Sequence, residues 1–233
     1  MSFEKLTRKS EKAISGVLSN DLWQQKVDPL GFSVAELQKG QALSDELMQL
    51  SAMQQKEYGE QYSATDVLRR AKSDAWQVYK HHLQIARLAL ADDRGQYKAL
   101  QLDGRRERNL LKWVKQARTF YANAKNVAPA LKAYGLKSEE LKQGAAMVEA
   151  VYQAYDLRDK ERDEALQSTQ TRLQAETALS RWMKRYERAL RFAFEDQPEV
   201  LKELGLKVKE ETVATVFISS MPTGQNPDVI NPS

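Results

Sequence analysis

Apolar residues recur along most of the chain at intervals of three and four positions, the spacing that places side chains on one face of an α-helix. The stripes cover residues 3–18, continue from about Ser33, and resume after an interruption near residue 60. Helix-forming residues dominate the composition, and the 233 residues include only 10 Gly and 6 Pro. The pattern therefore predicts an all-α protein.

One long stretch of this pattern occurs twice. Residues 31–102 align without a gap to residues 135–206, a shift of 104 positions, and 18 of the 72 pairs are identical. About four or five identities are expected by chance at ordinary residue frequencies. The chain is therefore predicted to be a tandem duplication of a helical unit.

The repeat predicts two units, residues 1–104 and 105–208, followed by an irregular C-terminal tail, residues 209–233. We expect each unit to contain an opening helix, a long antiparallel helix hairpin and short capping helices. Gly59 and Ser63 favour a turn in the first unit, with Ser63 capping the next helix. Residues 145–197 contain neither Gly nor Pro, so the second unit either turns near residues 166–169 or forms one continuous helix; by analogy with the first unit, we expect the turn.

The duplicated stripes are expected to face each other across an approximate two-fold axis. Such a pseudo-two-fold bundle would bury Trp76 and Trp182 in equivalent environments. Gly31, Gly135 and Gly205 each follow a short helix and precede an apolar residue, which is typical of a left-handed helix C-cap.

The character of the sequence changes after Thr212, where β-branched and aromatic residues precede a segment rich in Pro and Gly. This tail could pair with a strand of a partner. Packing on its own helices, or fraying, is the interpretation we favour.

The composition suggests a soluble, cytoplasmic protein. The chain has no Cys, which rules out disulfides and thiolate metal clusters and is compatible with a reducing compartment. The basic residues near Met1 are not followed by an apolar run, so we expect no secretory signal. No stretch is apolar enough to predict a membrane-spanning helix.

Positive charge is concentrated after the first unit. Residues 105–135 contain eight Lys and Arg residues against Glu107 alone. A three–four–three spacing would align four of these cations on one helix face and form a possible anion-binding ridge: Arg105, Arg108, Lys112 and Lys115. Such a ridge could bind nucleic-acid phosphates or anionic lipid headgroups, although a solvated helix face is the commoner explanation of such a charge run.

A second basic face is expected in the last long helix, formed by Arg181, Lys184, Arg185, Arg188 and Arg191. The neighbouring Trp182 and Tyr186 could offer stacking platforms to a single strand. Their spacing is that of core residues, however, and we expect both rings to be buried and the cations to be partly neutralised by the acidic stretch 156–164.

The chain contains few residues suited to chemistry. Its only histidines, His81 and His82, are adjacent and lack the Glu three positions earlier that a di-iron bundle needs, so we expect lone surface or boundary histidines. Two carboxylate pairs recur in both units, Glu57 with Glu60 and Glu161 with Glu164. They could bind a cation or act as acid and base, but salt bridges to Arg69, Arg70 and Arg172 are the expectation we favour.

No phosphate-binding glycine loop, nucleophile elbow or Ser-His-Asp set is present in the sequence. We therefore expect no cofactor, and a non-enzymatic helical binding or scaffold protein that acts on an unidentified protein partner. The alternative hypothesis is binding of nucleic acid or an anionic membrane surface through residues 105–118. A homo-oligomer is compatible with either function.

Overall fold

The computed structural model describes residues 3–208, and within this range it contains helices and no strands, so the all-α prediction is confirmed. The tail at 209–233, including the apolar segment after Thr212, lies outside the described residues. The helices and 3-10 turns, in chain order, are α1 (Phe3–Leu18), α2 (Asp21–Val27), η1 (Asp28–Leu30), α3 (Val34–Ala89), α4 (Arg94–Ala99), α5 (Leu110–Ala124), η2 (Lys125–Val127), α6 (Ala128–Ala133), α7 (Ser138–Ala193) and α8 (Pro198–Glu203).

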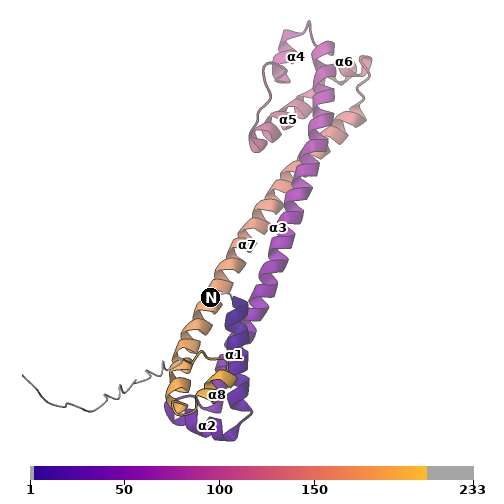
Figure 1. Ribbon diagram of the computed structural model, residues 1–233. Coiled ribbons are helices and arrows are strands. Elements are labelled where there is room, and N and C mark those ends of the chain that lie inside the picture. Colours follow the sequence, from indigo (N-terminus) through magenta and orange to yellow (C-terminus); the bar gives the residue numbers. More distant parts are fainter. Residues whose placement is uncertain (1–2, 209–233) are drawn as a thin grey trace, which may run out of the picture.

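Two helices of 56 residues, α3 and α7, form the axis of the molecule. They run antiparallel and lie side by side over their whole length (Figure 1). Each starts at a satisfied end: the Ser33 side chain accepts a hydrogen bond from the backbone N–H of Glu36, and the Glu140 carboxylate accepts one from the backbone N–H of Lys137. At 1.5 Å per residue, each helix is about 84 Å long.

The predicted hairpin within each unit is wrong, because both long helices are continuous through the expected turns at Gly59 and at 166–169. The residues that suggested the turns bond inside the helix instead. The Ser63 hydroxyl donates to the Gly59 carbonyl, and the Thr169 hydroxyl donates to the Ala165 carbonyl. Such bonds satisfy a Ser or Thr hydroxyl without interrupting a helix.

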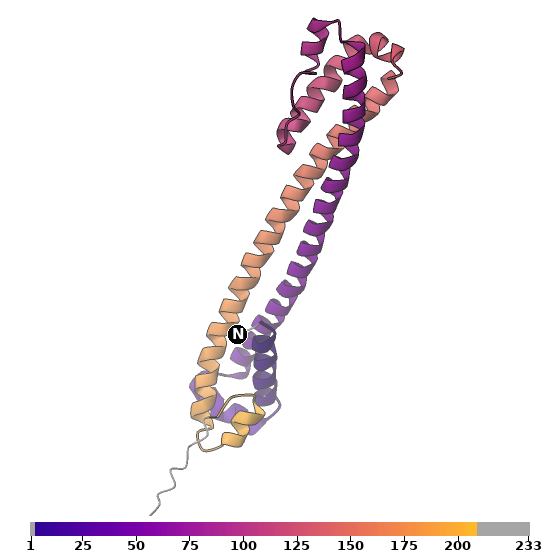
Figure 2. The same cartoon turned by 45° about the horizontal axis from the view of Figure 1, so that its top comes forward.

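The buried side chains form two separate cores. They lie at the two ends of the α3–α7 pair, where the short helices are gathered (Figure 2). The α5 lobe consists of α4, α5, α6, the end of α3 and the start of α7. The α1 lobe consists of α1, α2, α8, the start of α3 and the end of α7. Each core combines residues from both halves of the sequence. The predicted division of the chain into units 1–104 and 105–208 therefore stays a prediction about the repeat in the sequence.

The expected equivalence of Trp76 and Trp182 is wrong. Trp182 is only 5% exposed in the core of the α1 lobe, where its indole lies against Gly40, whereas Trp76 is 36% exposed at the surface of the α5 lobe. A shift of 104 positions pairs neither Trp with the other.

The three predicted glycine C-caps are confirmed. Gly31, Gly135 and Gly205 have φ values of 85°, 90° and 77°, in the left-handed region that a residue with a Cβ rarely adopts. Each turns the chain at the end of a short helix and directs it back towards the long helices. None of the described helices has a stretch apolar enough to cross a membrane.

Candidate anion-binding cleft

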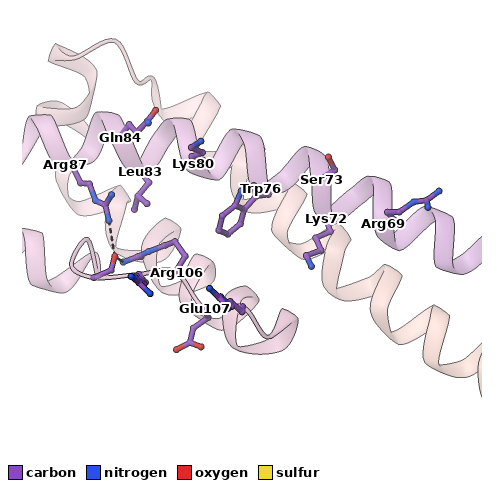
Figure 3. A pocket seen from close by; sticks show the side chains of 13 residues that line it. Arg69, Lys72, Ser73, Trp76, Lys80, Leu83, Gln84, Arg87, Arg106 and Glu107 are labelled. Carbon is purple, nitrogen blue, oxygen red and sulfur yellow. Dashed lines mark hydrogen bonds between the residues drawn. The ribbon is translucent and has the colours of Figure 1, made fainter.

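A cleft of about 770 Å³ opens between the last third of α3 and the segment that connects α4 to α5 (Figure 3). The helix contributes one wall and residues 104–108 contribute the other. Its lining is mostly cationic and consists of Arg69, Lys72, Ser73, Trp76, Lys80, Leu83, Gln84, Arg87, Gly104, Arg105, Arg106, Glu107 and Arg108.

The α3 wall is one helical stripe. Arg69, Lys72, Trp76, Lys80 and Arg87 follow spacings close to whole helical turns, so they lie on the same face of α3. Trp76 stands between this face and the connecting segment (Figure 3). Its ring centroid lies 5.7 Å from that of the buried Trp113, which leaves one part of the indole packed and another part open to the cleft.

Two arginines hold the connecting segment against α3. The Arg87 guanidinium donates to the Leu102 carbonyl through Nε at 3.0 Å and Nη2 at 2.8 Å. Arg106 Nη1 donates to the Tyr79 hydroxyl at 3.1 Å. Burial raises the pKa of Tyr79 despite the opposing effect of Arg106, so this hydroxyl stays protonated at neutral pH. Arg87 and Arg106 are therefore structural parts of the cleft.

The remaining cations are available to a ligand. Arg69 pairs with Asp66 at 3.0 Å, but both groups are exposed. Among residues 3–208, no carboxylate lies within ion-pairing distance of Lys72, Lys80, Arg105 or Arg108. Glu107 is the one acidic residue in the lining, and in Figure 3 its side chain points away from α3. The cleft therefore carries a large excess of positive charge.

The predicted basic ridge is divided by the fold. Arg105 and Arg108 line the cleft, whereas Lys112 and Lys115 are exposed on α5 outside it. The prediction that all four cations lie on one helix face is wrong, because α5 begins only at Leu110. The Asn109 side chain caps this helix by accepting a hydrogen bond from the backbone N–H of Lys112. Arg105 and Arg108 lie in the connecting segment and face α3 instead.

The second predicted basic face is confirmed as exposed, and the Trp182 and Tyr186 rings are buried as expected. The predicted partial neutralisation of these cations by the acidic stretch 156–164 is not what the structure shows. Arg185 pairs with Glu36 of α3 at 3.1 Å, whereas the acidic stretch 156–164 pairs with its own Arg158, Lys160 and Arg162.

The two carboxylate pairs are brought together at the middle of the α3–α7 pair. Carboxylate oxygens of Glu57, Glu60 and Glu161 lie within 4.8 Å of one another. The predicted salt bridges from these glutamates to arginines are wrong. Glu60 pairs with Lys56 at 3.4 Å, and Glu164 pairs with Lys160 at 3.5 Å. Arg69 pairs with Asp66, and Arg172 with Glu176.

The histidines are placed differently from each other. His81 is exposed, as expected for a surface residue. His82 is only 4% exposed, and its Nδ1 lies 3.1 Å from the Tyr121 hydroxyl. Burial lowers the pKa of His82, so its ring is neutral at pH 7 and serves the packing of the α5 lobe.

Sequence reasoning missed the α3 wall of the cleft. The signal was present as a cationic stripe with Trp76 at helical spacing, but it lies about thirty positions before Arg105. Comparisons with protein-family models, curated proteins and solved structures gave no match. The function must therefore be argued from the cleft itself.

Proposed function

We propose that this chain is a non-enzymatic helical binding protein, and that the cleft of the α5 lobe binds the phosphates of single-stranded nucleic acid. The observation that carries the proposal is a cleft with seven Lys and Arg residues, one acidic residue and a partly exposed Trp in its lining. A cytoplasmic location, expected from the cysteine-free composition, belongs to the same proposal.

The charge favours a ligand with several phosphates. Like charges gathered in a cleft repel one another, and an anion relieves this repulsion while its condensed counterions are released. Lys72 and Lys80 approach from α3, and Arg105 and Arg108 from the opposite wall. A flexible chain of phosphates could contact both walls at once.

The shape and the Trp favour a single strand over a membrane. A lipid surface is flat and broad, whereas these cations face into a recess between two elements. Trp76 adds an aromatic surface on which an unpaired base could stack, a contact worth about 1–3 kcal/mol per base in other proteins. A duplex keeps its base faces covered and could not use this contact.

Binding of a fluorescein-labelled oligothymidylate, followed by anisotropy at increasing salt, tests the proposal. We expect a Kd that rises steeply with salt, because each phosphate contact to a single strand contributes a slope of about −0.7 in log K against log salt. The variant K72Q/K80Q/R105Q/R108Q should bind at least tenfold more weakly and show a shallower slope.

The variant K112Q/K115Q is the matched control, because it removes two nearby exposed charges from outside the cleft. It should retain most of the affinity. Equal losses in both variants, a flat salt dependence, or binding to phosphatidylserine vesicles but not to the oligonucleotide would contradict the proposal.

Binding to a protein partner is a second candidate function, favoured by an exposed aromatic residue at the edge of a groove. Phe192 is 70% exposed and lines a hollow of about 660 Å³ with Leu30 and Phe32. In affinity capture from nuclease-treated lysate, we expect a partner retained by the wild type and lost from Phe192→Ser. A catch that disappears with nuclease treatment would favour nucleic acid instead.

We also propose that the chain arose by tandem duplication and has pseudo-two-fold symmetry. The identities at a shift of 104 positions support this origin, as do the bounds of α3 and α7, which differ by 104 at both ends. The bounds of α4 and α8 differ by the same shift. A poor superposition of the backbone of residues 31–102 on that of residues 135–206 would contradict it.

A further inference from the structure

A second basic cleft lies in the α1 lobe, at the other end of the long helices. It has a volume of about 530 Å³ and lies between α1, the last turn of α7 and the residues that follow α8. The described lining contains six cationic side chains and no acidic one: Lys5, Arg8, Lys9, Lys12, Arg191, Gly205 and Lys207.

Within residues 3–208, most of these cations have no carboxylate partner. Lys9 pairs with Glu187 at 2.7 Å and is largely covered. No other lining cation has a carboxylate within ion-pairing distance among the described residues. Lys5, Arg8 and Lys12 follow a three–four spacing, so they share one face of α1 and point their charges at the same space.

The two clefts share one wall of the same kind, although the opposite wall is α3 in the α5 lobe and α1 in the α1 lobe. Arg87 in the last turn of α3 donates to the Leu102 carbonyl beyond α4, and Arg191 in the last turn of α7 donates to the Lys207 carbonyl beyond α8, at 2.9 Å. In each lobe, the segment held by this arginine forms one wall of a basic cleft. None of the described lining residues of the α1-lobe cleft is aromatic, so they offer charge without a counterpart of Trp76.

The long helices fix the separation of the two clefts. The α1 residues that line the second cleft are level with Ser44 of α3, because the Ser10 hydroxyl lies 3.0 Å from the Ser44 hydroxyl. The first cleft is lined by α3 from Arg69 to Arg87, which is 25 to 43 residues further along the helix, or about 40–65 Å at 1.5 Å per residue. A short oligonucleotide bound in one cleft therefore cannot reach the other.

We propose that the α1 lobe contains a second phosphate-binding site for single-stranded nucleic acid, and that the chain bridges two strands held about 40–65 Å apart. The second site stands on its own residues, whereas the bridge also rests on the proposed function of the α5 lobe. The chemistry is the same at both ends, since Lys and Arg side chains bind phosphate oxygens. The spacer between them is a helix pair too long for one ligand of ordinary size to span.

Titration calorimetry with an oligothymidylate of about five nucleotides, at the short end of the usual range of about 4–16 per binding fold, counts the sites, because this strand is too short to reach both clefts. The wild type should bind two molecules per chain. The variant K5Q/R8Q/K12Q and the α5-lobe variant K72Q/K80Q/R105Q/R108Q should each bind one, and the combined variant none. The control R181Q/K184Q/K202Q removes three exposed charges of the α1 lobe from outside its cleft and should still bind two.

A bead assay tests the bridge directly. Beads that carry one biotinylated oligothymidylate should capture a second, fluorescent one through the wild type and the control, but not through either cleft variant. Circular dichroism melting should show that every variant is folded, because all of the changed residues are exposed.

The outcomes separate the two proposals. One oligonucleotide per wild-type chain, lost only from the α5-lobe variant, overturns the second site and leaves the proposed function standing. One oligonucleotide lost only from K5Q/R8Q/K12Q contradicts the proposed function and the bridge together. Binding to phosphatidylserine vesicles in place of oligonucleotides overturns both.

Discussion

Glycine has different consequences at three positions of the long helices. A Cβ on Gly40 would overlap the Trp182 indole, which is fixed by donating from Nε1 to Glu36 at 3.1 Å. A Cβ on Gly144 would overlap the Tyr121 ring in the same way. Gly59, in contrast, is exposed, and an added Cβ there would meet no atom within 4 Å. Two of these glycines serve close packing, and the third does not.

We predict that Gly59→Ala stabilises the protein. Gly in a helix interior costs about 0.5–1 kcal/mol relative to Ala, and nothing at this position opposes the change. The melting temperature should rise by about 2–4 °C per kcal/mol for a chain of this size. Gly40→Ala is the control and should be destabilising by about 1–3 kcal/mol through overpacking. A lower melting temperature for Gly59→Ala would indicate the turn that the structure lacks.

His82 should make the stability depend on pH. Burial, with the nearby His81, lowers the pKa of His82 in the folded state, while Glu140 opposes the shift. In the unfolded chain, His82 takes up a proton near its ordinary pKa of about 6.5. In the folded protein, the ring takes up this proton only at a lower pH. The contribution is therefore fully present above about pH 6.5 and is lost as the pH falls from there towards the folded pKa.

Urea unfolding at about pH 7.5 and pH 5.5, either side of the ordinary pKa, measures this effect. We expect the wild type to lose more stability on acidification than His82→Gln, because Gln does not titrate. His81→Gln, which changes an exposed neighbour, should retain most of the loss. An identical pH dependence in wild type and His82→Gln would contradict the assignment.

At the scale of the helices, the middle of the α3–α7 pair explains why the hairpin was predicted wrongly. Between Ser51 and Ala75, only Ala64 is buried on α3, because a two-helix segment has a narrow interface with solvent on both sides. Few apolar residues are therefore needed in this part of the sequence, and Gly59 lies among polar residues. A turn between two helices has the same sequence pattern. Helix continuity depends on the partner helix, through contacts such as Gln54 Nε2 donating to the Thr169 hydroxyl at 2.8 Å.

The ends of the elements were easier to predict than their middle. The helix stripes at both ends bury aromatic and aliphatic residues in full lobes, so their periodicity is strong. The glycine caps require a left-handed backbone, which the residue type itself indicates. In the cleft, Arg105 and Arg108 were found from local charge density. Lys72, Lys80 and Trp76 were missed because only the folded chain places α3 opposite residues 104–108.

The carboxylates at the middle of the helix pair lead to a prediction about charge. Glu57, Glu60 and Glu161 are close together, and the lysine pairs of Glu60 and Glu164 offset only part of their repulsion. Glu161→Gln should therefore raise stability by about 0.2–0.5 kcal/mol, the size of a surface charge pair. The gain should shrink at high salt, which screens exposed charges.

Thermal melting at low and high salt measures this gain. Glu164→Gln is the matched control, because it removes the same charge from the same stretch but breaks the pair with Lys160. It should be neutral or slightly destabilising. A lower melting temperature for Glu161→Gln would show that the repulsion is compensated by a group other than these lysines.

At the scale of the whole molecule, the part of the chain that the structure describes connects the two cores only through the sparsely buried middle of α3 and α7. On α7, Ala165 is the one buried residue between Ala154 and Ala175. Each lobe has its own aromatic cluster, around Tyr79 and Phe120 in the α5 lobe and around Trp182 and Tyr186 in the α1 lobe. Structural perturbations should therefore remain within the lobe in which they occur.

Hydrogen exchange in Gly144→Ala and Gly40→Ala tests this independence, since each substitution overpacks one lobe. A local loss of about 1.4 kcal/mol speeds exchange tenfold where the exchange rate follows the opening equilibrium. Gly144→Ala should accelerate exchange in α5 and in the flanking ends of α3 and α7, and leave α1 unchanged. Gly40→Ala should do the reverse, so each variant is the control for the other. Equal acceleration in both lobes would mean that the thin middle transmits stability, and that the chain unfolds as one cooperative unit.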